Sequence, residues 1–279
     1  MPFLERAGAP AIHYEYDDYT DPWKNAPILM LQHGYSRSAR IWYQWVPYLA
    51  RHYRVVRMDL RGLGRSPADF DLQTEMTAGH FIEDILAVID AHGGGPVHYC
   101  GESLGGILGM LLAAEHPDKL RTLTLVSAPL RLSARTQKDF ACGYASWQEA
   151  LRVLGSEGWS ERVNTITRFP AGTDPQLLDW YAKETGKSNV DALIRLSEIA
   201  CSVDVEPCLA RITTPTLGLY PMKGPITVND DDIILNTIAD MRMVRLPTTY
   251  HAIQFLMPAA CAQEVLHFAA QHDGISCHE

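Results

Sequence analysis

Three features are missing from this sequence, and each absence excludes a class of protein. No block of Lys and Arg occurs in the 279 residues, and the net charge is −9, so neither a nucleic acid nor an anionic membrane surface is an expected partner. The longest apolar stretches are too short to span a bilayer. Residues 1–18 lack the basic and apolar regions of a secretory signal peptide. We therefore expect a protein that binds neither nucleic acid nor membrane.

Paired cysteines are missing as well. Six cysteines are scattered without C-x-x-C spacing, namely Cys100, Cys142, Cys201, Cys208, Cys261 and Cys277. This pattern favours free thiols in a reducing cytoplasm over a disulfide framework. No Cys or His pair with ligand spacing lies near a second such pair, so no metal site is expected.

The sequence does contain an alternation of β-rich and helical segments in an ordinary globular composition, 47% hydrophobic and 20% charged. Alternation of this kind predicts an α/β fold, with a mostly parallel central sheet and helices on both faces. Strands are predicted at 11–16, 27–32, 53–59, 96–100, 120–127, 215–220 and 241–246, and helices at 39–51, 78–93, 103–117 and 258–272.

The alternation stops between about residues 129 and 208. This segment is rich in aromatic residues and has helical patterns but no convincing strand. It predicts a helical cap, 129–208, inserted over the edge of a sheet whose domain comprises 1–128 and 209–279.

The stretch "GESLGG" (101–106) places Ser103 between a predicted strand and a predicted helix. A sharp strand–turn–helix holds its central residue in a strained conformation and requires small neighbours, which Gly101, Gly105 and Gly106 provide. The pattern G-x-S-x-G occurs here in the context that a nucleophile needs. An ordinary turn is the alternative, and the context favours a nucleophilic Ser103.

A second turn, in "LQHGYS" (31–36), follows the predicted strand 27–32. A tetrahedral intermediate needs N–H donors directed at its oxyanion. We expect the N–H groups of Tyr35 and Leu104 to be these donors, because Gly34 lets the backbone turn towards the site and Leu104 follows the serine. His33 is expected to be structural.

His251 follows the last predicted strand, in "YHAIQF" (250–255). A general base for Ser103 must reach the carboxyl end of the sheet. Position and chain order therefore favour His251 as the base over a solvated surface histidine.

Together these segments resemble the α/β-hydrolase superfamily, in its capped group of esterases, lactonases, epoxide hydrolases, haloalkane dehalogenases and ring-cleavage C–C hydrolases. "QHGYS" is similar to that family's oxyanion turn, "CGESLGG" to its nucleophile elbow and "HAIQF" to its terminal histidine segment. "MDLRGLGRS" (58–66) is similar to a family loop in which Asp59 and Arg61 are implied to be structural. The dehalogenases and epoxide hydrolases place Asp at the elbow, so Ser103 argues against both.

One part of the family pattern is absent, the triad acid. Gly224 occupies the position where the resemblance implies an aspartate, and the alternative position, "VSAPLRL" (126–132), has no carboxylate. The acid could come from the cap, or the enzyme could work with a Ser–His dyad. Glu102 beside the serine would need an unusual route to the far nitrogen of His251.

The run "NDDD" offers the remaining choice. Asp230 is the first carboxylate after the predicted strand 215–220, and we take it as the candidate triad acid. Asp231 and Asp232 are expected to serve a helix N-terminus, where carboxylates stabilise exposed N–H groups, and the same structural role is the alternative for Asp230.

These interpretations predict a cytoplasmic serine hydrolase with no cofactor and a small-molecule substrate, namely a small apolar or aromatic ester, lactone or amide. The alternatives are a C–C bond hydrolase of aromatic ring-cleavage products, a ligand receptor or poorly catalytic binding protein and, more remotely, a cofactor-free oxygenase. Arg37, Arg40 and Arg131 flank the expected pocket mouth, where each is either a carboxylate ligand or a solvated charge. The oligomeric state, including a homo-oligomer, stays open.

Overall fold

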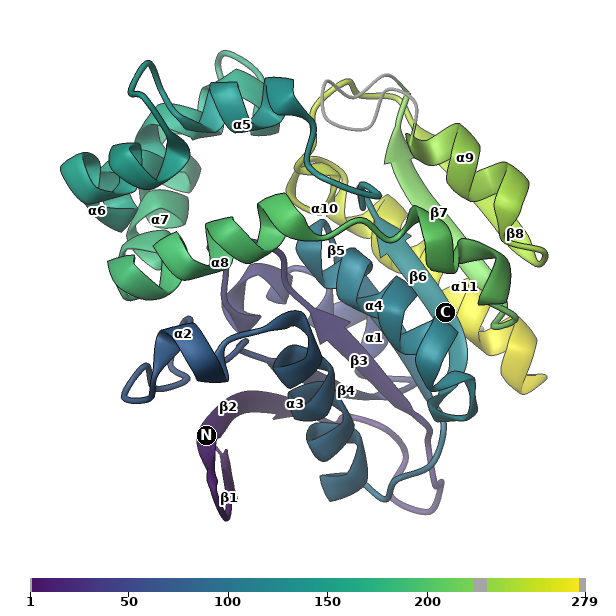
Figure 1. Ribbon diagram of the computed structural model, residues 1–279. Coiled ribbons are helices and arrows are strands. Elements are labelled where there is room, and N and C mark those ends of the chain that lie inside the picture. Colours follow the sequence, from purple (N-terminus) through teal and green to yellow (C-terminus); the bar gives the residue numbers. More distant parts are fainter. Residues whose placement is uncertain (1, 223–229, 276–279) are drawn as a thin grey trace.

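The computed structural model describes residues 2–222 and 230–275. An eight-stranded sheet has the order β1-β2-β4-β3-β5-β6-β7-β8 (Figure 1). All neighbouring strands from β4 to β8 are parallel, whereas β1 and β2 pair antiparallel at one edge, so the predicted α/β fold with a mostly parallel sheet is confirmed. The strands are β1 (Phe3–Arg6), which was not predicted, β2 (Ala9–Asp17), β3 (Ile28–Gln32), β4 (Arg54–Met58), β5 (Val97–Glu102), β6 (Leu120–Val126), β7 (Thr216–Pro221) and β8 (Met241–Leu246).

Helices cover both faces of this sheet and form two hydrophobic cores. On one face lie α3 (Ala78–Ala91) and α4 (Leu104–Glu115), and on the other α1 (Val46–Leu49) and α11 (Pro258–Asp273). The central strands β3 and β5 are buried along their whole length. Strands buried on both faces read as near-continuous apolar runs, and the run over 28–31 made β3 identifiable from sequence.

The single helix predicted over 39–51 is wrong. The segment divides into the 3₁₀ helix η1 (Ala39–Trp42) and the short helix α1. Pro47 lies in the first turn of α1, where its missing N–H costs no intrahelical hydrogen bond, so it starts a new helix rather than continuing the first.

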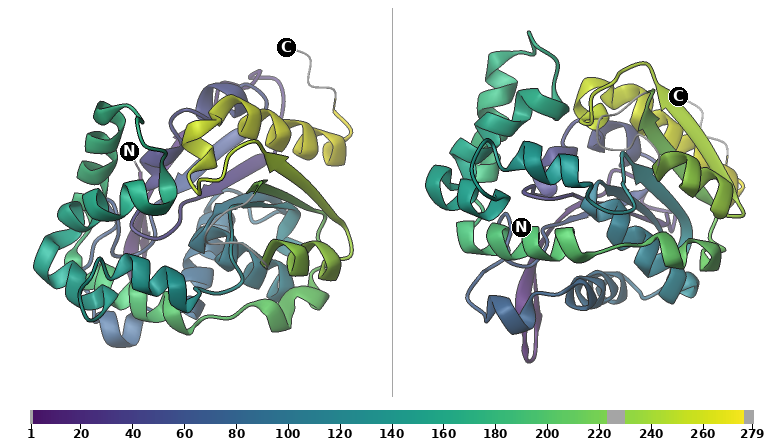
Figure 2. Two further views of the ribbon diagram at one scale, coloured as in Figure 1. Left: turned by 90° about the horizontal axis from the view of Figure 1, so that it is seen from above. Right: turned by 45° about the horizontal axis from the view of Figure 1, so that its top comes forward.

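The chain between β6 and β7 contributes no strand to the sheet. Its helices α5 (Ala134–Phe140), α6 (Trp147–Val163), α7 (Pro175–Gly186) and α8 (Val190–Ser202), with the π-helix η3 (Asn164–Arg168), form a separate layer that we call the cap (Figures 1 and 2). The remaining elements are α2 (Leu72–Glu75), η2 (Pro117–Lys119), η4 (Glu206–Arg211), α9 (Asp230–Thr237) and α10 (Ile253–Leu256).

Aromatic rings join the cap to the sheet domain. Trp147, Trp159 and Phe140 of the cap pack against one another, with ring centroids 4.8 to 5.8 Å apart. Tyr35, from the turn after β3, joins this cluster with its ring centroid 4.4 Å from that of Trp147. The cap is thereby packed onto the end of the sheet that carries the predicted site.

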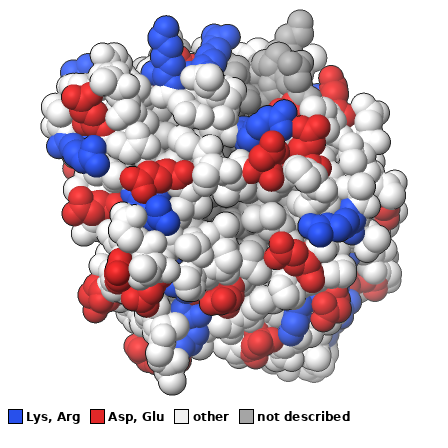
Figure 3. All heavy atoms as spheres, viewed as in Figure 1, with Lys and Arg blue, Asp and Glu red and all other residues white. Residues whose placement is uncertain are grey.

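On the face of the molecule seen in Figure 3, acidic and basic side chains are interspersed with uncharged ones. None of the helices within the described ranges is long and apolar enough to cross a membrane. Cys100, Cys142, Cys201, Cys208 and Cys261 are free thiols, as predicted, and Cys277 lies outside the described residues.

Candidate active site

Ser103 lies at the tight turn between β5 and α4. Its backbone has φ 53° and ψ −115°, a conformation that non-glycine residues rarely adopt. The Ser103 N–H donates to the carbonyl of Val126, 2.9 Å away on β6, and this bond holds the turn against the neighbouring strand. The side chain is therefore presented at the carboxyl end of the sheet.

The glycines of this turn permit close backbone packing. A Cβ on Gly101 would collide with the backbone of Gly105, and a Cβ on Gly105 would lie 2.5 Å from the carbonyl oxygen of Gln32. The strand, the helix and the turn after β3 can approach one another only because these positions lack side chains.

The turn after β3 is fixed by hydrogen bonds on both sides. The Gly34 N–H donates to Oε2 of Glu102 at 2.9 Å. The ring of His33 accepts at Nε2 from the Leu60 N–H, 3.0 Å away, and its Nδ1 donates to the Gly34 carbonyl at 2.8 Å. Burial lowers the pKa of His33, so the ring stays neutral and holds this turn, the structural role expected for it.

Tyr35 and Leu104 line the same pocket as Ser103. Neither N–H donates to an acceptor within residues 2–222 and 230–275. Leu104 begins α4, whose first N–H groups have no intrahelical partner. Both donors are thus available to an oxygen atom bound beside Ser103.

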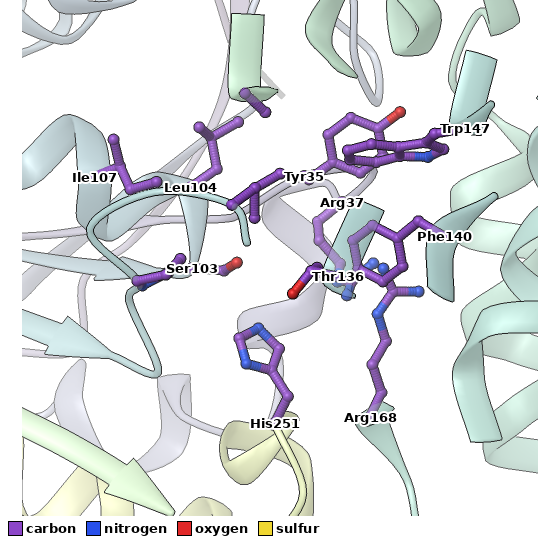
Figure 4. A pocket seen from close by; sticks show the side chains of 13 residues that line it. Tyr35, Arg37, Ser103, Leu104, Ile107, Thr136, Phe140, Trp147, Arg168 and His251 are labelled. Atoms are coloured by element: carbon purple, nitrogen blue, oxygen red, sulfur yellow. The ribbon is translucent and has the colours of Figure 1, made fainter. Parts of the chain in front are cut away.

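His251 lies in the loop between β8 and α10, and the cap holds this loop in place. The His251 N–H donates to the Thr167 carbonyl at 3.0 Å, and the Ala252 N–H donates to the Arg168 carbonyl at 3.2 Å. The imidazole is 4% exposed. Figure 4 shows the side chains of Ser103 and His251 facing one pocket, so the structure brings the predicted nucleophile and base to the same place.

The carboxylate that pairs with His251 is Glu102. Its Oε1 lies 3.4 Å from Nε2 of His251, and its side chain is fully buried. Burial alone would raise the pKa of Glu102, but the contact with His251 and the charges of Arg37 and Arg168 outweigh it and lower the pKa to about 2. Glu102 thus lies beside Nε2 of His251, and no hydrogen bond or ion pair within the described residues joins it to Nδ1, the other ring nitrogen.

Asp230 is placed elsewhere. It begins α9, and its Oδ2 accepts a hydrogen bond from the Leu130 N–H at 3.0 Å. Burial, the largest influence, raises the pKa of Asp230. Asp231 pairs with Arg245, and both it and Asp232 lie in the first turn of α9, as the helix-start interpretation expects. Gly224 lies outside the described residues.

Asp59 and Arg61 have structural partners. The Asp59 carboxylate accepts from the Ala39 N–H at 2.5 Å and contacts the ring of His13 at 2.8 Å. Arg61 forms two hydrogen bonds of 2.6 Å with the buried carboxylate of Asp84. Both side chains therefore fasten the loop after β4 to the rest of the domain, as the family resemblance implies.

Two arginines line the pocket, and sequence reasoning identified one of them. Arg37 lies in the pocket wall, whereas Arg40 and Arg131 are half exposed: Arg40 pairs with the buried carboxylate of Glu184, and Arg131 with the exposed carboxylates of Asp204 and Glu206. Arg168, at the end of the π-helix η3, is the second pocket arginine (Figure 4). No motif surrounds Arg168, and Ser103 and His251, which line the same pocket, are distant from it in sequence, so no local signal pointed to a site residue here.

The rest of the pocket is mostly apolar and aromatic. Its sheet-domain side includes Ile107 and Pro129, and its cap side includes Phe140, Trp147 and Ala200. A nucleophile and an imidazole in a pocket of this kind can attack a small, largely apolar carbonyl compound.

Comparison with known proteins gives consistent matches. The family model described as alpha/beta hydrolase fold matches residues 27–152. The chain is 30% identical over 240 residues to a putative carbamate hydrolase RutD of Agrobacterium fabrum, covering 83% of this chain and 84% of the relative. It is 25% identical over 213 residues to 3-oxoadipate enol-lactonase 1 of Acinetobacter baylyi, covering 75% of each.

A similar solved structure is that of a hydrolase from Pseudomonas aeruginosa PA01, at 25% identity. The TM-score is 0.80, and the match covers 96% of this chain and 97% of that one. The fold likeness thus extends over the cap as well as the sheet.

Proposed function

Because the chain belongs to the α/β-hydrolase superfamily and is an esterase- or lactonase-like enzyme, we propose that it is a serine hydrolase that cleaves small apolar or aromatic esters, lactones or amides through Ser103 and His251. The observation that carries this proposal is that Ser103 has a strained backbone and lines one pocket together with the buried imidazole of His251. The free thiols fit the proposed cytoplasmic location, because a reducing compartment keeps cysteines unpaired.

Acylation begins when His251 takes the proton of the Ser103 hydroxyl as its oxygen attacks the substrate carbonyl. The N–H groups of Tyr35 and Leu104 stabilise the oxyanion of the tetrahedral intermediate. The intermediate collapses when the imidazolium gives its proton to the leaving alcohol or amine, and an acyl group remains on Ser103. In deacylation His251 takes a proton from water, the hydroxide attacks the acyl carbon, and Ser103 leaves with that proton.

We assign Glu102 the role of stabilising the imidazolium in both half-reactions. Its carboxylate is buried, ionised and 3.4 Å from the ring, and a charge in such surroundings interacts more strongly than it would in water. The same carboxylate accepts from the Gly34 N–H, so it also holds the turn that carries the Tyr35 N–H. Asp230 remains the competing candidate, and the two assignments are separable by mutation.

The experiment is a substrate panel run with the purified protein and its Ser103→Ala variant. It contains aryl esters, lactones, enol lactones and carbamates, the last two because of the relatives' names. It also contains a vinylogous diketone of the kind that C–C hydrolases cleave. We expect turnover of at least one acyl substrate that depends on Ser103. Turnover of the diketone alone would support the C–C hydrolase, and turnover of nothing would support the receptor.

A further inference from the structure

The pocket beside Ser103 holds more positive than negative charge. Arg37 is 4% exposed and Arg168 is 2% exposed, and both line the wall that also contains Ser103 and His251. The charges of both arginines act on the buried carboxylate of Glu102, which pairs with His251. Two buried cations thus face one buried anion.

Neither guanidinium has the partners that a buried cation requires. Among the described residues, neither forms an ion pair with a carboxylate. Arg37 donates from Nη1 to the Ser36 hydroxyl at 2.9 Å, but its buried Nε has no acceptor. Arg168 donates to Oδ1 of Asn164 over 3.3 Å, a long bond for a charged donor. Burying a charge without a counter-charge costs free energy of folding. Such an arrangement is therefore typical of a site that binds an anion.

Aromatic rings hold both groups in place without neutralising them. The Arg37 guanidinium lies 4.4 Å from the centroid of the Tyr181 ring. That of Arg168 lies 5.3 Å from the Phe140 ring and 5.2 Å from the Trp159 ring. Stacking of this kind orients a guanidinium while leaving its N–H edge free for a planar acceptor.

Burial, followed by repulsion from Arg37, lowers the pKa of Arg168 to about 10. The two positive charges repel each other, and an anion bound between them would relieve this repulsion. Figure 4 shows the two guanidinium groups converging from the sheet domain and from the cap, beside Thr136 and within the pocket that Ser103 enters.

We propose that Arg37 and Arg168 form a carboxylate-binding subsite, and that the substrate is an ester or lactone whose acyl part carries a second, ionised carboxylate. This inference rests on the proposed serine hydrolase function and narrows it. The carboxylate binds the two guanidiniums, while the carbonyl to be attacked lies at Ser103 with its oxygen towards the Tyr35 and Leu104 N–H groups. Apolar pocket walls accommodate the carbon chain between these two ends.

The test compares monomethyl esters of succinic, glutaric and adipic acids with neutral isosteres in which an isopropyl group replaces the carboxylate. The isosteres are methyl 4-methylpentanoate, methyl 5-methylhexanoate and methyl 6-methylheptanoate. We expect kcat/KM of wild-type protein to favour the acid at one or more chain lengths by roughly 10- to 100-fold, the range for hydrogen bonds between charged groups. Acids hydrolysed no faster than their isosteres at all three lengths would overturn the proposal.

Variants locate the effect. We expect Arg37→Met and Arg168→Met each to reduce the acid-to-isostere ratio of kcat/KM about tenfold or more. Arg40→Met is the matched control, because this arginine lies outside the pocket and pairs with Glu184 at 3.5 Å, and it should leave the ratio unchanged. An unchanged ratio in both pocket variants would contradict the assignment.

A measurement on the wild-type protein guards against a pocket variant that fails to fold. Pentanoate should inhibit hydrolysis of a neutral ester competitively and about tenfold more strongly than pentanamide, and 0.5 M NaCl should weaken the difference. Equal inhibition by the two would refute the subsite. Absence of turnover with every ester would instead refute the serine hydrolase function itself, so the two failures are distinguishable.

Discussion

The two walls of the pocket are built in different ways. The core wall, comprising the turn at 32–35 and the elbow at Ser103, is positioned by backbone: a positive φ, glycine contacts and hydrogen bonds of main-chain groups. The cap wall, comprising α5, α6 and η3, is positioned by side chains, chiefly stacked aromatic rings and Arg168. Backbone geometry thus holds the turn that carries Ser103, whereas side chains of the cap form the opposite wall of the pocket.

The largest effect on activity is expected when the reacting groups of the core wall are removed. We expect Ser103→Ala to lower kcat by 10⁴- to 10⁶-fold, roughly, because the nucleophile is lost. His251→Ala should be comparably damaging, and the double variant no worse than either single one, because the pair acts as a unit. Steady-state kinetics on the best substrate of the panel measures this.

Ser202→Ala is the control, a serine on the exposed end of α8 whose hydroxyl donates to the Ile199 carbonyl. It should keep wild-type kcat. More than a tenth of wild-type activity in Ser103→Ala would remove that residue from the mechanism.

Removing the carboxylate that assists His251 should have the next largest effect on kcat. Glu102→Gln removes the charge beside His251, and we expect kcat to fall on the order of 10²- to 10⁴-fold, the range for an orienting carboxylate. Asp230→Asn, Asp231→Asn and Asp232→Asn should each stay within about threefold of wild type, less than 1 kcal/mol. The opposite pattern, with Asp230→Asn inactive and Glu102→Gln active, would restore Asp230 as the triad acid.

The pH dependence of the free energy of unfolding tests the same carboxylate. The pKa of Glu102 is lowered from 4.5 to about 2, so the folded protein binds this proton less readily than the unfolded chain does. Its contribution is complete above pH 4.5 and is lost as the pH falls towards 2; it amounts to roughly 3 kcal/mol. Urea unfolding should show that the free energy of unfolding of the wild-type protein falls over this pH interval. In Glu102→Gln this fall should be smaller by about 3 kcal/mol. Parallel curves would contradict the lowered pKa.

The smallest effect concerns Tyr35, which belongs to both walls. Its N–H lies on the core wall, whereas its hydroxyl donates to the Leu193 carbonyl of α8 at 2.7 Å. Tyr35→Phe removes this buried hydrogen bond and should cost about 1 kcal/mol in the free energy of unfolding. Tyr43→Phe, at a 47% exposed ring, is the control and should cost nothing measurable. Equal stability of the two variants would show that this bond does not help hold the cap.

The contrast between the walls also explains what the sequence could predict. Strand–turn–helix punctuation and glycines at fixed spacing are local, so the sheet, the strained turn at Ser103 and the turn at 32–35 were predictable. Fold class is confirmed, and the placement of His251 in the same pocket follows from its position after the last strand.

What could not be predicted depends on contacts between distant segments. Glu102 lies beside His251 although the two are 149 positions apart in sequence, and no local residue pattern marks such a contact. Arg168 enters the pocket because η3 ends there, with its carbonyl bonded to the Ala252 N–H. Conversely, residues 39–51 have a helical pattern, but Pro47 starts a second helix within it. Trp42 and Trp45, on either side of the break, are both buried.

Fluorophosphonate labelling tests the central claim most directly, because phosphonylation requires an activated serine and no knowledge of the substrate. The serine oxygen displaces fluoride, and peptide mass spectrometry locates the adduct. We predict rapid, stoichiometric labelling of wild-type protein at Ser103, much slower labelling of His251→Ala and none of Ser103→Ala. A folded wild-type protein that remains unlabelled, or a Ser103→Ala variant labelled as fast as wild type, would contradict the account.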